Sequence, residues 1–168
     1  MYIKQFLVLI LFAVNSILSQ EPPKTTTTPA KEVPKQELVK KEPGISFVKS
    51  EWKDIVAIAT KEKKYIFIDA YTTWCSPCKW MDENVYNSKQ AEDYFSSKFI
   101  SVKMDMEKEE GLLFKDKYRV DAYPTYLFFD STGKVIHRFQ GPLEVENFIK
   151  EVENTFTPDK AFYELKRK

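Results

Sequence analysis

Trp74-Cys75-Ser76-Pro77-Cys78-Lys79 is the stretch that decides the fold, and it contains both cysteines of the 168-residue chain. Two thiols separated by two residues can meet at a helix start, where free N–H groups and the helix dipole stabilise a thiolate. Pro77 suits this first turn because its φ is helical and its missing N–H would have no partner there. We therefore expect a redox-active pair, with Cys75 as the nucleophile and Cys78 as the resolving cysteine.

Two structural interpretations of the pair compete with redox chemistry. Half of a zinc site would need two further Cys, His or carboxylate ligands, and His137 is the only histidine in the chain. A purely structural disulfide is disfavoured because a bridge that closes so small a loop removes little entropy from the unfolded chain. We expect no metal and no cofactor.

Helical and strand periods alternate along the chain, which is typical of an α/β fold with helices on both faces of a sheet. Strands are expected over residues 65–71, 99–104, 125–129 and 135–139, and helices over 51–61, 78–85, 89–95, 109–118 and 143–152. Ser50 is expected to cap the first helix, and Asn87 or Ser88 the helix that restarts after a break. His137 alternates with its neighbours on an outer strand, which predicts a solvent-facing side chain.

Three features together resemble the thioredoxin superfamily: the motif at 74–79, Asp69 six positions upstream, and Tyr123-Pro124-Thr125 before a hydrophobic strand. The resemblance covers residues 46–156. It implies a thioredoxin-like α/β fold with a central mixed β-sheet flanked by helices on both faces. It also implies an enzyme, a thiol-disulfide oxidoreductase.

The resemblance assigns roles to residues around the cysteines. Asp69 matches a buried aspartate that assists proton movement at the resolving cysteine, and Lys103 matches a lysine that offsets the cost of burying it. Pro124 matches a proline with a cis peptide bond beside the disulfide, so Tyr123 is expected to contact substrate. Trp74 is expected to shield the thiolate at the surface and to belong to the substrate-binding residues. The alternatives are that Asp69 caps a loop and that Pro124 is a trans proline opening a strand.

The ends of the chain differ in kind from this domain. Lys4 and the apolar run from Phe6 to Leu18 predict an export signal over residues 1–20, with an uncleaved membrane anchor as the alternative. Residues 21–45 hold five of the nine prolines among Thr, Lys and Glu, which predicts a flexible linker. Residues 157–168 are expected to form a charged tail or a short helix.

Net charge and the use of cysteines limit the possible partners and location of the protein. The net charge of +1 offers no electrostatic attraction for nucleic acid. An exported protein usually uses cysteines for structural bridges, whereas this chain reserves both thiols for exchange. We expect a periplasmic or secreted monomer that acts on disulfide- or thiol-containing proteins and serves cell redox homeostasis.

The direction of electron flow depends on the residues between the cysteines. Ser76-Pro77 contains no histidine, which favours a potential near about −270 mV over about −120 mV and hence a reductase. By analogy, a membrane disulfide reductase would supply its electrons. A disulfide oxidase or isomerase and a non-catalytic peptide-binding module are the alternatives. Many thioredoxins have glycine in place of Ser76 and a small aliphatic residue in place of Tyr123, so the substrate preference stays open.

Overall fold

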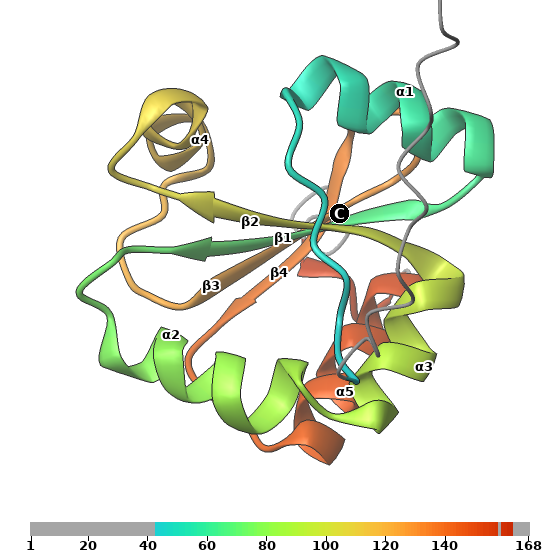
Figure 1. Ribbon diagram of the computed structural model, residues 1–168. Helices are drawn as coiled ribbons and strands as arrows, with labels where there is room; N and C mark the ends of the chain where they lie inside the picture. The colour runs from blue at the N-terminus through green and yellow to red at the C-terminus, as the bar shows by residue number, and fades with distance from the viewer. Residues whose placement is uncertain (1–42, 158, 163–168) are drawn as a thin grey trace, which may run out of the picture. The chain divides into compact units, whose positions relative to one another are not determined.

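Four strands form one mixed sheet in the computed structural model, which describes residues 43–157 and 159–162 (Figure 1). The strands are β1 (Tyr65–Tyr71), β2 (Phe99–Asp105), β3 (Thr125–Phe129) and β4 (Val135–Gln140). Their order is β2-β1-β3-β4; β1 runs parallel to β2 and antiparallel to β3, and β3 runs antiparallel to β4. The expected α/β architecture with a central mixed sheet is confirmed.

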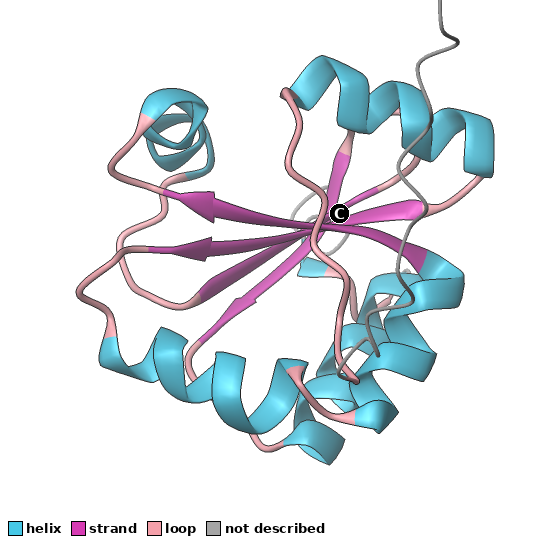
Figure 2. Cartoon of the chain, viewed as in Figure 1, coloured by secondary structure: helices cyan, strands magenta, loops and turns pink. Residues whose placement is uncertain are grey.

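Helices cover both faces of this sheet (Figure 2). One face carries α1 (Trp52–Glu62) and α4 (Glu109–Tyr118). The other carries α2 (Ser76–Met81), α3 (Lys89–Lys98) and α5 (Val145–Glu153). A π-helical turn, Asp82–Tyr86, continues α2, and a 3₁₀ turn, Asn154–Phe156, follows α5.

Alternate side chains of β1 enter two different cores, because successive residues of a strand point to opposite faces. Ile66 and Ile68 join the cluster beneath α1 and α4. Phe67 joins the opposite cluster, whose buried aromatic members are Phe67, Tyr86, Phe95, Phe99, Tyr126, Phe128 and Phe148. Asp69 lies two positions after Phe67, so its carboxylate enters the aromatic core.

The first helix begins one residue later than expected, and Ser50 does not cap it. Glu51 occupies the N-cap position without a side-chain hydrogen bond. Instead, the N–H of Trp52 donates to Oε2 of Glu110 on α4 at 3.0 Å. The prediction for Ser50 is wrong because a carboxylate distant in the sequence satisfies one of the free N–H groups of the helix start.

The helix that carries the second cysteine begins two residues before Cys78. Sγ of Cys75 caps it by accepting a hydrogen bond from the N–H of Cys78. After the π-turn the chain breaks at Asn87, and Ser88 caps α3 by accepting from the N–H of Ala91 at 3.1 Å. The predicted break and the restart with Ser88 as cap are confirmed.

His137 is buried, with 3% of its surface exposed, so the expectation of a solvent-facing side chain is wrong. Its Nδ1 accepts a hydrogen bond from the N–H of Phe162 at 3.0 Å, and its Nε2 lies 3.7 Å from Oε1 of Glu151 on α5. Burial lowers the pKa of His137, and the charge of Glu151 opposes that shift. The alternation along β4 could not reveal that a segment beyond α5 covers this strand.

The expected export signal at 1–20 and the linker as far as residue 42 lie outside the described residues, as do 163–168 of the expected tail. Export, the linker and the domain boundaries therefore stay predictions. Within 43–157 and 159–162, no helix has the length and apolar character needed to cross a membrane.

Candidate active site

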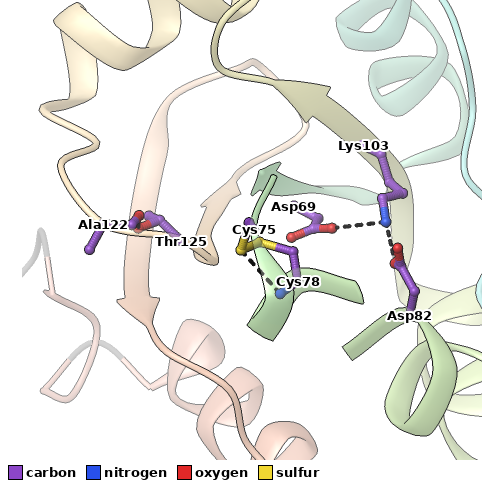
Figure 3. The surroundings of a disulfide bond; sticks show 7 residues. All are labelled: Asp69, Cys75, Cys78, Asp82, Lys103, Ala122 and Thr125. Carbon is purple, nitrogen blue, oxygen red and sulfur yellow. Dashed lines mark hydrogen bonds and ion pairs between the residues drawn. A yellow bond between two sulfur atoms is a disulfide. The ribbon is translucent and has the colours of Figure 1, made fainter. Parts of the chain in front are cut away.

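Cys75 and Cys78 form a disulfide where the chain passes from β1 into α2 (Figure 3). Both residues are almost fully buried, with 3% and 2% of their surfaces exposed. The N–H of Cys78 donates to Sγ of Cys75 at 3.1 Å. Because this donor is directed at Cys75, it favours a thiolate on that sulfur once the disulfide opens, as expected for the nucleophile.

The two cysteines bond to each other rather than to a metal-binding set. In the part of the chain that the structure describes, no group of three or more His, Cys, Asp or Glu residues is placed to hold a metal ion. His137, the only histidine of the chain, is buried, accepts a hydrogen bond from the N–H of Phe162 and lies beside Glu151.

Asp69 lies in the middle of β1 and is completely buried, so it does not cap a loop. The parallel register places it opposite Lys103 on β2, whose Nζ lies 3.4 Å from Oδ2 of Asp69. Burial raises the pKa of Asp69 from 3.8 to about 6, and the positive charge of Lys103 opposes this rise. A carboxyl group with such a pKa can both accept and release a proton near neutral pH.

Lys103 has a second carboxylate partner that the sequence did not reveal. Its Nζ also bonds to Oδ1 of Asp82 on the π-turn (Figure 3). The negative charge of Asp82 contributes to the raised pKa of Asp69. One signal was present: Asp82 follows Cys78 by four residues and so continues the same helix face.

The ammonium of Lys103 is further surrounded by three aromatic rings, whose centroids lie 5.0–5.5 Å from Nζ: those of Phe47, Tyr71 and Tyr86.

The peptide bond between Tyr123 and Pro124 is cis, as expected, so the alternative of a trans proline is excluded. The residues on either side are tied together, because Oγ1 of Thr125 donates to the carbonyl oxygen of Ala122 at 2.7 Å. Both belong to the surroundings of the disulfide in Figure 3. The structure thus brings the proline segment to the cysteines.

Trp74 stands on the surface next to the disulfide, with 64% of its area exposed. Its indole N–H donates to both carboxylate oxygens of Glu107, at 3.0 and 3.1 Å. Its ring meets that of Tyr123 edge to face, with centroids 5.8 Å apart. Trp74 and Tyr123, both expected to contact substrate, therefore form one aromatic surface that Glu107 holds in place.

A shallow groove adjoins the disulfide on the α2 side. Its lining residues are Ser76, Pro77, Trp80, Pro142, Leu143, Glu144 and Asn147. Ser76 and Pro77 stand between the two cysteines, so the groove borders the dithiol loop, although neither cysteine lines it. Its mainly apolar lining suits an extended peptide with apolar side chains.

A Cys-X-X-Cys disulfide at a helix start, with a buried carboxyl group and a cis proline nearby on a mixed α/β sheet, defines the class of dithiol-containing α/β proteins. A protein-family model described as thioredoxin-like matches residues 48–131 of the sequence. This match spans half of the chain, and the chain belongs to the thioredoxin-like family. The expected thioredoxin-like fold is confirmed.

Individual relatives agree with this assignment. The chain is 33% identical over 94 residues to the chloroplastic thioredoxin Y of Oryza sativa subsp. japonica, covering 56% of this chain and 52% of that one. It is 35% identical over 78 residues to thioredoxin-1 of Drosophila yakuba, covering 46% and 68% of the two chains. The chain spans about half the length of the chloroplast relatives that it matches.

The fold also resembles a solved structure, at a sequence identity similar to that of these relatives. The solution structure of a putative disulphide-isomerase from Bacteroides thetaiotaomicron superimposes with a TM-score of 0.64 and 38% sequence identity. The alignment covers 70% of this chain and 97% of that one.

Proposed function

We propose that the protein is a thiol-disulfide oxidoreductase that reduces disulfides in other proteins. The observation that carries this proposal is the bond between the only two cysteines of the chain, with the N–H of Cys78 directed at Sγ of Cys75. The names of the relatives, which include thioredoxins and a putative disulphide-isomerase, support the same chemistry.

The reaction starts from the reduced protein and proceeds in two exchanges. The Cys75 thiolate attacks a substrate disulfide, forming a mixed disulfide and releasing one substrate thiolate, which takes a proton from water. Cys78 then gives its proton to the carboxylate of Asp69 and attacks the sulfur of Cys75. The mixed disulfide breaks, the Cys75–Cys78 bond forms, and the second substrate sulfur leaves and is protonated. The substrate gains the two electrons that the dithiol loses.

Substrates are expected to be extended, disulfide-containing protein segments. The aromatic surface of Trp74 and Tyr123 and the groove at Pro77 and Trp80 both adjoin the disulfide. Cys75 is only 3% exposed in the oxidised state, so a substrate must dock closely beside it, and these two surfaces are where we propose that it docks. A flexible segment can do so more easily than a rigid domain.

Reduction is the favoured direction because Ser76-Pro77 contains no histidine to stabilise the thiolate of the reduced form. The apolar run at Phe6–Leu18 supports the further proposal that the protein acts outside the cytoplasm. A reductase in that location needs a continuing supply of electrons, for which we propose a membrane disulfide reductase as the donor.

Disulfide formation or isomerisation is the second candidate function. It is favoured by the 38% identity to the putative disulphide-isomerase of Bacteroides thetaiotaomicron. The two directions differ in the reduction potential of the cysteine pair. Equilibration in glutathione buffers followed by thiol labelling measures this potential directly. A value near about −270 mV supports the reductase, whereas one near about −120 mV would make disulfide formation the leading function.

Trapping tests whether exchange occurs at all. The Cys78→Ser variant lacks the resolving thiol, so Cys75 should accumulate mixed disulfides with substrate proteins that a reductant releases. The Cys75→Ser variant is the matched control and should trap far less, because the nucleophile is missing. Equal trapping by the two variants, or none by either, would contradict the proposed exchange.

A further inference from the structure

Asp69 shares its buried surroundings with two tyrosine hydroxyls. Among the described residues, the side-chain oxygens of Asp69, Tyr86 and Tyr126 are all buried without a hydrogen bond of standard geometry, and the ion pair of Asp69 with Lys103, at 3.4 Å, involves Oδ2 only. Leaving such groups unpaired in an apolar core costs free energy, so they rarely occur without a reason. Three of them together in one aromatic core point to a polar cluster with a function.

The sheet itself places Tyr126 beside Asp69. The two residues lie directly opposite each other in the antiparallel pair of β1 and β3. Directly opposed side chains share one face of a sheet and have Cβ atoms about 4.5–5.5 Å apart. Asp69 therefore has Lys103 as its neighbour on β2 and Tyr126 as its neighbour on β3.

Tyr86 approaches the same carboxylate from the helical layer. It is the last residue of the π-turn that continues α2, and 2% of its surface is exposed. Its ring lies 5.8 Å from that of Phe148 and 5.5 Å from the ammonium of Lys103. Tyr126 contacts Phe148 as well, with ring centroids 5.0 Å apart. The two tyrosines are thus packed on one aromatic side chain and face one carboxylate.

The electrostatics of the three groups are coupled. Burial raises the pKa of both phenols, and the charge of Asp69 raises them further. In the opposite direction, the hydroxyl of Tyr86 lowers the pKa of Asp69, against the larger effect of burial. Both phenols therefore keep their protons at neutral pH and are available as hydrogen-bond donors.

Hydroxyl groups can serve Asp69 in both of its protonation states. A phenol can donate to the ionised carboxylate and can accept from the protonated carboxyl group, whereas an ammonium only donates. We propose that Tyr86 and Tyr126 are positioning residues, whose hydroxyls solvate the Asp69 carboxylate after it takes a proton from or returns one to Cys78. This inference rests on the proposed exchange reaction and deepens it.

The remaining charges around Asp69 are few. Lys103 on β2 and Asp82 on the π-turn face it, and they also pair with each other. The sulfurs of Cys75 and Cys78 join them when the disulfide opens. Any test must therefore change the hydroxyls alone and leave these charges in place.

Tyr86→Phe removes one hydroxyl and keeps the ring. In the oxidised full-length chain, the titration midpoint of Asp69, followed by carboxyl ¹³C NMR, should move upward from about 6. The expected shift is about one pH unit, because the ionised form loses a donor. Tyr126→Phe should shift the midpoint in the same direction by less. The double variant should shift it by less than the sum, because both hydroxyls serve one carboxylate.

Tyr94→Phe is the matched control. This tyrosine on α3 also has a buried hydroxyl without a hydrogen bond of standard geometry, but burial and Glu153, not Asp69, raise its pKa. It should leave the midpoint of Asp69 unchanged. The proposal is overturned if Tyr86→Phe behaves like this control, which would mean that its hydroxyl is merely an unpaired group.

The pH profile of exchange supplies the functional readout. In a single-turnover assay, the rate of the resolving step should change with pH around the pKa of Asp69. In Tyr86→Phe, the midpoint of this change should move together with the NMR midpoint. A moved NMR midpoint with an unmoved midpoint in the rate profile would also overturn the proposal. Absence of any exchange by the wild-type protein, with the NMR shifts as expected, would instead refute the proposed function and leave the solvation of Asp69 by the hydroxyls established.

Discussion

Replacing Asp69 with asparagine should change how the stability of the oxidised protein depends on pH. The carboxyl group has a pKa of about 6 in the folded chain, against 3.8 for an unperturbed aspartate in the unfolded chain. A raised folded pKa means that the folded state binds the proton more tightly. The stability contributed by this group is therefore fully present below pH 3.8 and is lost as the pH rises through about 6.

The size of the effect follows from that difference. About 2.2 pH units, at 1.36 kcal/mol each, correspond to about 3 kcal/mol of unfolding free energy. Asparagine has nearly the same shape and does not ionise, so Asp69→Asn lacks this loss. The unfolded carboxyl group is already more than half ionised at pH 4, so about 0.5 kcal/mol of this loss occurs below that pH. The gap in unfolding free energy between variant and wild type should therefore move by about 2.5 kcal/mol in favour of the variant between pH 4 and pH 8.

Urea unfolding at several pH values between 4 and 8 measures this gap, with the disulfide kept closed in both proteins. Only the change of the gap with pH is diagnostic, because burying an amide has a constant cost of its own. The pH dependence of groups that do not interact with Asp69, His137 among them, is common to both proteins and cancels. A gap that stays constant across this range would refute the reasoning, because Asp69 would then ionise with the same pKa in both states.

Three further changes test other parts of the molecule. Trp74→Ala should lower kcat/KM for protein disulfides about tenfold while unfolding free energy stays within about 0.5 kcal/mol, since the side chain is 64% exposed; unchanged kinetics would contradict its contact with substrate. His137 has a lowered pKa in the folded state, so the stability that this group contributes above pH 6.5 is lost as the pH falls. In urea unfolding at several pH values, His137→Asn should therefore show a smaller loss of unfolding free energy on acidification than the wild type. Gly111→Ala would place a Cβ 2.0 Å from the carbonyl oxygen of Asp105, so it should lower the unfolding free energy by about 1–3 kcal/mol or more. An unfolding free energy equal to that of the wild type would contradict this.

The strands could be predicted from sequence because their apolar runs are unambiguous. Tyr65–Tyr71 and Thr125–Phe129 have the predicted bounds, since each is buried on both faces and ends at polar or turn residues. The helix Glu109–Tyr118 also has its predicted bounds. Errors arose where a partner distant in the sequence decides the outcome, as Glu110 does for the start of α1.

Some residues of the site could be predicted from local motifs, whereas others could not. Cys75, Cys78 and Pro124 carry local motifs, and Asp69 is conspicuous as a charge within an apolar strand. Tyr86 and Tyr126 look like ordinary core residues in the sequence, because nothing local shows that they share the buried surroundings of a carboxylate. Their placement depends on the register between β1 and β3 and on the π-turn, neither of which periodicity can specify.

The segment just before α1 is attached to this same π-turn. The N–H of Ile45 donates to the carbonyl oxygen of Tyr86 at 2.8 Å, and the ring of Phe47 lies 5.4 Å from that of Tyr86. The amide proton of Ile45 can therefore exchange with solvent only when this bond opens. Its exchange rate offers a spectroscopic record of how often the backbone at Tyr86 loosens, in the oxidised and in the reduced protein, without any label near the cysteines.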